Sequence, residues 1–260
     1  MSTFETNLDY TKLRDVNSAR AKFATIVPST NTTVEYDFHA VRPAGITFPV
    51  GRMYIPEPQT RDDSEFSNMI KQVDASLEEA IKVVMTTSPD YLILAMSAPT
   101  FWGGVEGNAK MERRIREISG LQGVTSGSTA VRDALTTLGA KNIAFLTPYQ
   151  PVGDDQVERF FNEAGFNVKR SIGLKVPSID MISRTPTSTL MDALRAMDSD
   201  DVDVLVQAGT NLSMVSLADE AERWLGKPVV TINAATLWHA LRNYGIKDQF
   251  EGFGSLLRDF

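Results

Sequence analysis

Small hydroxyl and amide side chains gather in four short stretches of this chain, and each stretch directly follows a run of apolar residues. The stretches are residues 29–31, 97–100, 147–150 and 209–211. Neutral donors of this kind suit a small carboxylate, because hydrogen bonds to a charged acceptor are strong. A bulkier phosphate is disfavoured, since no glycine-rich sequence makes room for it. The stretches therefore predict a binding site for a small carboxylate.

The first stretch belongs to the segment FATIVPSTNTTVEYDF, residues 23–38. Residues 23–27 read as a buried strand, and a helix is expected to begin between Thr33 and Glu35. A parallel strand carries its carboxyl end to a crevice, and the N–H groups that open the next helix lack partners inside it. An anion would fit against these N–H groups. The alternative is that the hydroxyl and amide groups only cap the helix.

Composition limits the function classes. The chain has 260 residues, a formal net charge of -7, 42% hydrophobic residues, no cysteine and two histidines. An acidic chain is a poor partner for nucleic acid or an anionic membrane, and disulfides, thiol catalysis and thiolate metal sites are excluded. We expect no metal site. Charges throughout residues 1–20 argue against a signal peptide, so we expect a cytoplasmic protein.

Apolar spacing gives the main elements. Positions from Phe66 to Val84 repeat every three or four residues, which predicts a helix capped by Asp63 or Ser64 with one buried face. Residues 91–95 are continuously apolar, as in a parallel strand covered on both sides. We also expect one short strand over residues 46–54 and a helix near residues 110–118.

The pattern then repeats. KFATIVP, which ends at Pro28, matches NIAFLTP, which ends at Pro148, 120 positions later. VTSGSTAVRDALTTLG matches VTINAATLWHALRNYG at an offset of 106, which pairs Thr125 with Thr231. A duplication of this kind predicts an α/β fold with two pseudosymmetric lobes, each a parallel sheet with helices on both faces. We place an N-terminal arm at 1–20 and the lobes at 21–139 and 140–260. The C-terminal helix could cross back to the first lobe, and the four polar turns would line the cleft between the lobes.

Several motifs resemble a known family. VPSTNTT at 27–33, TPY at 147–149, GTN at 209–211 and NAATLWHALR at 233–242 resemble the aspartate/glutamate racemase superfamily, and within it the maleate cis-trans isomerase and arylmalonate decarboxylase branch. The resemblance implies the two-lobe fold, a site that needs no cofactor, and small carboxylate substrates. Relatives commonly self-associate, and together with the apolar pair Leu237 and Trp238 this favours a homo-oligomer.

The resemblance also suggests roles. Asn31 matches an amide that holds a substrate carboxylate, and Tyr149 matches a phenol that hydrogen-bonds a carboxylate or enediolate oxygen. The family's two cysteines would fall at Met96, with Ser97 a one-residue alternative, and at Gly209. We therefore predict Ser97 and Tyr149 as catalytic residues. The expected substrate-binding residues are Ser29, Thr30, Asn31, Met96, Thr100, Gly209, Thr210 and Asn211.

Without a thiol at either position, the two-cysteine mechanism is impossible, and three hypotheses remain. The favoured one is an enzyme with non-thiol chemistry on a small carboxylate, by hydrolytic ring opening or decarboxylation, with isomerisation kept open by resemblance. The others are a binding protein that lost catalysis and an isomerase whose cysteines were replaced. A cyclic amide or lactone is the nearest competing ligand. Asp180 and Arg184 are minor candidates for acid–base chemistry, and His239 reads as a satisfied core histidine.

Overall fold

Two parallel β-sheets form the framework of the protein. The computed structural model describes residues 8–260. The strands of the first sheet are β1 (Ala21–Pro28), β2 (Ile46–Thr47), β3 (Val50–Met53), β4 (Tyr91–Leu94) and β5 (Val124–Ser126). The central strand β1 pairs with β2 and β3 on one side and with β4 on the other, and β4 pairs with the edge strand β5. The single strand expected over 46–54 is therefore wrong in detail, because that run divides into β2 and β3.

The second sheet repeats this arrangement. Its order is β7-β6-β8-β9, with all neighbours parallel. The first sheet has the same order once β2 and β3 are taken together, since β2 pairs with the start of β1 and β3 with its end. The predicted duplication is thus present as two sheets of like topology. The strands are β6 (Asn142–Thr147), β7 (Asn167–Gly173), β8 (Val204–Gln207) and β9 (Val229–Thr231).

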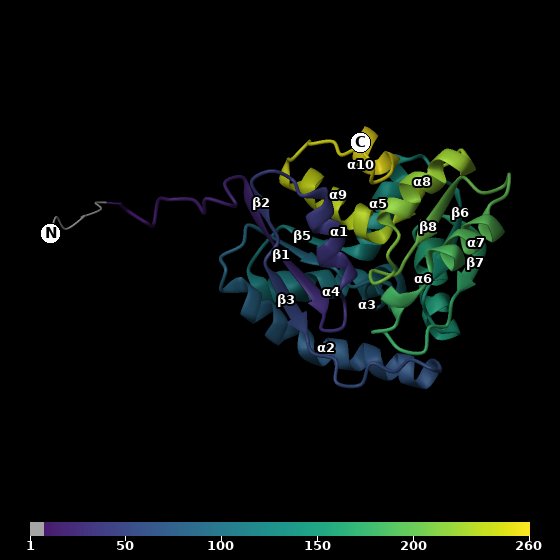
Figure 1. Ribbon diagram of the computed structural model, residues 1–260. Helices are drawn as coiled ribbons and strands as arrows, with labels where there is room; N and C mark the ends of the chain where they lie inside the picture. The colour runs from purple at the N-terminus through teal and green to yellow at the C-terminus, as the bar shows by residue number, and fades with distance from the viewer. Residues whose placement is uncertain (1–7) are drawn as a thin grey trace.

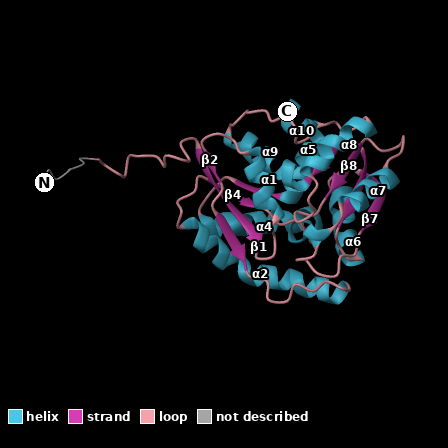
Figure 2. Cartoon of the chain, viewed as in Figure 1, coloured by secondary structure: helices cyan, strands magenta, loops and turns pink. Residues whose placement is uncertain are grey.

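Helices flank both sheets (Figures 1 and 2). In the first lobe α2 packs on β1 and β3, while α9 packs on β4 and β5. In the second lobe α6 packs on β7, and α7 packs on β6 and β7. The helices are α1 (Thr33–Val41), α2 (Asp63–Met85), α3 (Ala98–Phe101), α4 (Gly104–Ser119), α5 (Gly127–Thr137), α6 (Pro151–Glu163), the 3-10 helix η1 (Ile182–Arg184), α7 (Thr187–Met197), α8 (Val215–Leu225), α9 (Ile232–Tyr244) and α10 (Ser255–Asp259).

Two helices begin at residues other than those predicted from the sequence. The long helix α2 lies where its apolar period predicts, but the side chain of Asp62, rather than Asp63 or Ser64, accepts the N–H of Glu65. Helix α4 begins at Gly104, before the expected residue 110. The choice of cap between adjacent polar residues at α2 is not visible in the apolar pattern. Helix α4 has no side-chain cap and follows Gly103, which has a left-handed φ of 78°.

The two copies of the repeat meet at helices α5 and α9, which pack against each other. Ser126 caps α5 and Thr231 caps α9, each accepting an N–H three residues later. The caps are therefore 105 positions apart, and the pairing of Thr125 with Thr231 at an offset of 106 is wrong by one residue. Because α9 also packs on β4, β5 and α1, the second half of the chain returns to the first lobe.

The side chains of Leu237 and Trp238 of α9 are buried inside the protein. Leu237 is 1% exposed and Trp238 7%, and the indole N–H donates to the Phe260 carbonyl at 3.2 Å. These two side chains are therefore not available to a partner subunit, contrary to the expectation. Self-association stays a prediction that rests on family resemblance alone. The expected lobe boundary at 139/140 falls between α5 and β6. Residues 1–7 of the expected arm lie outside the described residues.

No helix within residues 8–260 is long and apolar enough to cross a membrane.

Candidate active site

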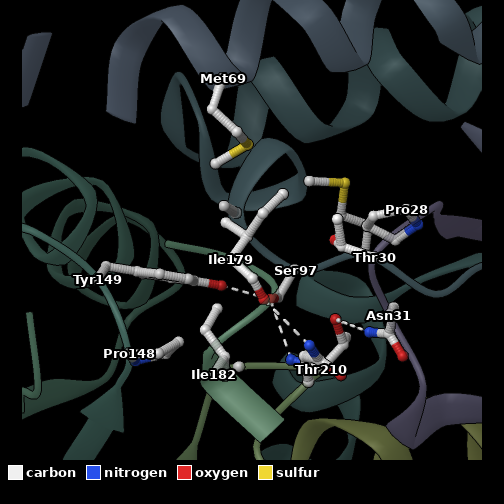
Figure 3. Close-up of a pocket in the computed structure, with 14 residues that line it drawn as sticks. Pro28, Thr30, Asn31, Met69, Ser97, Pro148, Tyr149, Ile179, Ile182 and Thr210 are labelled. Atoms are coloured by element: carbon white, nitrogen blue, oxygen red, sulfur yellow. Dashed lines mark hydrogen bonds between the residues drawn. The ribbon is translucent and has the colours of Figure 1, made fainter. Parts of the chain in front are cut away.

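A cavity lies between the lobes, where β1, β4, β6 and β8 end (Figure 3). The space between its walls is about 370 Å³, including the opening to solvent. All four predicted turns contribute to it, although they are far apart in the sequence: residues 209–211 line it in full, and each of the other three turns supplies two residues. The lining residues are Pro28, Thr30, Asn31, Met69, Met96, Ser97, Ala98, Pro148, Tyr149, Ile179, Ile182, Gly209, Thr210 and Asn211.

Two predicted binding residues, Ser29 and Thr100, are not among the lining residues. The Ser29 hydroxyl accepts the Ile55 N–H at 3.1 Å. Thr100 is fully buried, where its hydroxyl donates to the Ser97 carbonyl at 2.7 Å and accepts the Ser128 N–H at 3.2 Å. Both hydroxyls hold backbone turns in shape and neither lies in the cavity lining, so their role in ligand binding stays a prediction.

Ser97 and Tyr149 form a hydrogen-bonded pair with a definite direction. The Tyr149 hydroxyl donates to the Ala208 carbonyl at 2.8 Å. Because a phenol has one proton, the hydrogen bond between Ser97 and Tyr149 must use the serine proton. The Ser97 oxygen in turn accepts the Thr210 N–H at 3.3 Å. A chain of three hydrogen bonds therefore runs from the Thr210 amide through both hydroxyls to Ala208.

This pair does not make an activated nucleophile. Burial raises the pKa of Tyr149 above its ordinary value near 10, so the phenol is a neutral donor and does not act as a base. Within residues 8–260, no histidine, lysine or carboxylate is hydrogen-bonded to the Ser97 hydroxyl or lines the cavity beside it, so none could remove its proton. An alcohol without such a base is a weak nucleophile. Both hydroxyls are therefore neutral, and in this structure their protons are donated to Ala208 and to Tyr149.

The described lining residues include no aspartate, glutamate, lysine, arginine or histidine. One carboxylate stands behind the turn: Asp154 accepts the Thr147 hydroxyl, which accepts the Tyr149 N–H at 3.0 Å. Burial raises the pKa of Asp154 to about 6. It supports the turn and lies outside the cavity lining, so the cavity itself contains no group that could act as a strong base.

The N–H groups that open α1 are occupied by side chains. The Asn31 Oδ1 atom accepts the N–H groups of Thr33 and Val34, each at 3.0 Å. The Thr32 N–H donates to Asn211 Oδ1 at 3.2 Å. The expectation that these N–H groups remain free for an anion is wrong, because two asparagine amides take the place of the anion.

Asn31 still presents a donor to the cavity. Since its oxygen caps α1, its Nδ2 group points the other way, toward Thr210 Oγ1 at 3.3 Å, as Figure 3 shows. Further donors lie in the backbone: the N–H groups of Ser97, Ala98 and Asn211 have no hydrogen-bond partner in the described part of the chain. All of these donors are neutral, so they could hold a carboxylate without neutralising it.

The other wall of the cavity is apolar. Met69 of α2 and Ile179 and Ile182 of the segment before α7 line it together with Met96 and Pro148. Sequence reasoning missed Met69, Ile179 and Ile182 as site residues, although Met69 lies on the predicted buried face of α2. The segment before α7 has no periodic pattern that would have shown which side chains turn inward.

The charged side chains of that segment turn elsewhere. Arg184 pairs with Asp180 at 3.5 Å, Asp180 accepts the Ser178 hydroxyl, and neither charged residue lines the cavity. Their minor assignment as acid–base or clamp residues is corrected. His239 is satisfied in the core as predicted, with Nε2 3.0 Å from Asp133 Oδ2 and Nδ1 2.9 Å from Thr125 Oγ1.

Met96 and Gly209 occupy the two positions at which the resemblance places cysteines. Met96 is buried and adds a thioether to the apolar wall. At Gly209 a Cβ atom would lie 2.5 Å from Pro148 Cδ, so any side chain there requires the Pro148 turn to move. Among residues 8–260 no group of three histidine, aspartate or glutamate side chains could hold a metal ion.

Residues 62–257, which carry most of the cavity lining, match the family model described as arylmalonate decarboxylase. The chain belongs to the arylmalonate decarboxylase family. The arylmalonate decarboxylase of Bordetella bronchiseptica is 31% identical over 149 residues, which cover 56% of this chain and 61% of that protein. The maleate isomerase of Pseudomonas putida is 26% identical over 244 residues, which cover 89% of this chain and 95% of that protein.

The family fold is seen in solved structures as well. A cysteine-to-serine mutant of the Nocardia farcinica maleate cis-trans isomerase, with a covalently bound succinylcysteine intermediate, has a TM-score of 0.84 and 25% identity, over 92% of this chain and 99% of that one. A crystal structure of arylmalonate decarboxylase has a TM-score of 0.72 and 22% identity, over 91% and 98%. These relatives are enzymes, and this family member differs in having no cysteine.

Proposed function

We propose that this protein is a decarboxylase that acts on a small malonate-type diacid with an apolar substituent. The cavity that would hold the substrate has neutral hydrogen-bond donors on one side and methionine and isoleucine side chains on the other. The donors would hold the carboxylate that stays, and the apolar wall would receive the carboxylate that leaves. A poorly solvated carboxylate is destabilised relative to neutral CO₂, so this arrangement favours C–C cleavage.

The observation that carries the proposal is that the described cavity lining has donors and no base. Decarboxylation requires no proton abstraction from carbon. The C–C bond breaks, CO₂ leaves, and the electron pair stays with the remaining fragment as an enediolate. The enediolate charge would be stabilised by the Asn31 amide and by backbone N–H groups, in the manner of an oxyanion hole.

The fragment must then gain one proton at carbon. An enediolate carbon is far more basic than a phenolate, so a neutral Tyr149 hydroxyl is acidic enough to supply that proton, even with its pKa raised. Tyr149 would regain its proton from water, directly or through Ser97, whose hydroxyl already donates to it. The net reaction converts one diacid dianion and one proton into one monoacid anion and CO₂.

The competing reactions fit the cavity less well. Hydrolytic ring opening needs a water molecule or hydroxyl activated by a base, and the described lining residues provide none. The Nocardia isomerase forms a succinylcysteine intermediate, which a chain without cysteine cannot form. The isomerase hypothesis would require another nucleophile, and Ser97 has no partner that could activate it.

Proton NMR of the protein with malonate, methylmalonate, phenylmalonate, maleate and a cyclic imide in deuterated water tests the proposal. We expect loss of CO₂ from at least one malonate and one deuterium on the α-carbon of the monoacid product. Conversion of maleate to fumarate, or opening of the imide, would instead support the competing reactions. Binding of a malonate with no turnover of any compound would identify a binding protein.

A further inference from the structure

The buried side-chain amide of Asn233 links Thr210, which lines the cavity, to the carboxyl group of Asp37. Asn233, at the start of α9, is 3% exposed. Its Nδ2 group donates to Asp37 Oδ2 at 2.7 Å and to the Thr210 carbonyl at 2.9 Å. An amide nitrogen has two protons, so both are in use. Asn233 therefore joins α1 and α9, two helices that pack together (Figure 1), to the turn after β8.

The bond to Thr210 determines the direction of a neighbouring donor. The Thr210 carbonyl and the Asn211 N–H belong to the same peptide unit, which is planar and trans, so they point in opposite directions. A carbonyl held toward Asn233 turns the Asn211 N–H away from Asn233. That N–H has no partner in the described part of the chain, and Asn211 lines the cavity.

The side chain of Asn211 does not provide this donor. Its oxygen accepts from Thr32 and Thr33, and its nitrogen donates to the Ile179 carbonyl at 3.1 Å. These bonds fix the side chain and use one of its two amide protons, so the Asn211 donor whose direction depends on Thr210 is the backbone N–H. The orientation of the 210–211 peptide then decides whether a carboxylate meets a donor or a carbonyl oxygen at this point.

Asp37 holds the amide in place. It is 5% exposed, and its hydrogen bond to Asn233 is the one bond recorded for its side chain in the described chain. Without an acceptor at this position, Asn233 could rotate about its side-chain bonds and release Thr210. Asp37 thus influences the orientation of the Thr210 carbonyl at the cavity through Asn233.

We propose that Asp37 and Asn233 are positioning residues that aim the Asn211 backbone N–H at a carboxylate of the substrate. The inference rests on the proposed function only in requiring a carboxylate ligand, and it requires no decarboxylation. It assigns neither residue a contact with the reacting atoms. Their effect on the ligand passes through the 210–211 peptide.

Four variants separate positioning from general loss of structure. Asn233→Ala removes both hydrogen bonds, Asp37→Leu removes the acceptor, and Asp37→Asn keeps an acceptor oxygen of the same shape. Thr236→Val is the matched control, because Thr236 is also buried on α9 and its hydroxyl bonds only to Ile232 of the same helix. Circular dichroism verifies that each variant is folded.

The first readout needs no ligand. Loss of a hydrogen bond shifts a carbonyl ¹³C resonance upfield, so we expect Asn233→Ala and Asp37→Leu to move the Thr210 carbonyl signal, and Asp37→Asn and Thr236→Val to leave it near the wild-type value. If folded Asp37→Leu and Asn233→Ala proteins keep the wild-type Thr210 signal, the proposal is overturned.

The second readout is titration with malonate, methylmalonate and phenylmalonate, followed by the Asn211 amide resonance. We expect a large shift of that resonance in the wild type, at least about tenfold weaker binding in Asn233→Ala and Asp37→Leu, and recovery to within about twofold in Asp37→Asn. Failure of all three acids to move the Asn211 resonance, or unchanged affinity in folded Asn233→Ala, overturns the inference. Binding with these effects but without CO₂ release would refute the proposed function alone.

Discussion

Replacement of Tyr149 by phenylalanine should separate the chemistry of the cavity from its packing. The tyrosine is 4% exposed, and its ring packs against Phe66 with the ring centroids 5.2 Å apart. Phenylalanine keeps that ring and loses only the hydroxyl, which links Ser97 to the Ala208 carbonyl. The substitution therefore removes the proposed proton donor without opening a cavity in the core.

The expected magnitudes follow from those contacts. Loss of a buried hydroxyl with two hydrogen bonds should lower the free energy of unfolding by about 1 to 3 kcal/mol. Loss of a general acid should lower the rate of CO₂ release by about 10² to 10⁴-fold, which corresponds to about 3 to 5 kcal/mol of transition-state stabilisation. Thermal unfolding and a CO₂-release assay measure the two effects in one preparation.

Tyr91 provides a matched control. It is also 4% exposed, its ring packs on Phe23 at 5.2 Å, and its hydroxyl bonds to Thr125 at 2.9 Å, away from the cavity lining. Tyr91→Phe should cost comparable stability and leave the rate within about twofold of wild type. The reasoning fails if Tyr149→Phe retains more than half of the wild-type rate, or if both substitutions lower the rate equally.

Three further predictions concern stability and the cavity walls. Burial raises the pKa of Asp37 to about 7, so between pH 4 and 7 the folded protein keeps a proton that the unfolded chain has lost, and its stability falls as the pH rises. Asp37→Asn should remove this loss, so in denaturant titrations across that window its free energy of unfolding should increase relative to wild type by about 1.4 kcal/mol per pH unit. A difference between the two proteins that stays constant with pH would contradict this. Asn211→Ala should lower the midpoint of thermal unfolding, because it removes hydrogen bonds between the lobes, and an unchanged midpoint would show that those bonds add nothing. Gly209→Ala should be destabilised by about 1 to 3 kcal/mol through contact with Pro148, whereas a fully stable variant would mean that the turn relaxes freely.

Apolar patterns in the sequence were sufficient for the framework. The three-and-four spacing located α2, and the internal repeat predicted two parallel sheets, because both follow from local periods that the fold preserves. The repeat and the family resemblance together placed Ser29, Asn31, Ser97, Tyr149 and Asn211 in one cleft, and all of these except Ser29 line one cavity.

Hydrogen-bond partners across the lobes could not be predicted in the same way. The Thr32 N–H and the Asn211 oxygen are 179 positions apart, and their meeting depends on the register of one lobe against the other. For this reason the partner of the Thr32 N–H was not anticipated, whereas the Thr33 and Val34 N–H groups are taken by the nearby Asn31 side chain, as in the capping alternative. Ile179 and Ile182 were missed for a related cause, since a connecting segment without a period does not show which side chains face inward.

The central claim is that a cavity with neutral donors, an apolar wall and no thiol breaks a carbon–carbon bond. Carboxyl-¹³C-labelled phenylmalonate and methylmalonate, with mass-spectrometric detection of ¹³CO₂, test it most directly. The account predicts ¹³CO₂ release from at least one of these acids by the wild-type protein, at least about a hundredfold faster than by Tyr149→Phe. Release no faster than in buffer, from folded protein that binds the acid, would contradict it.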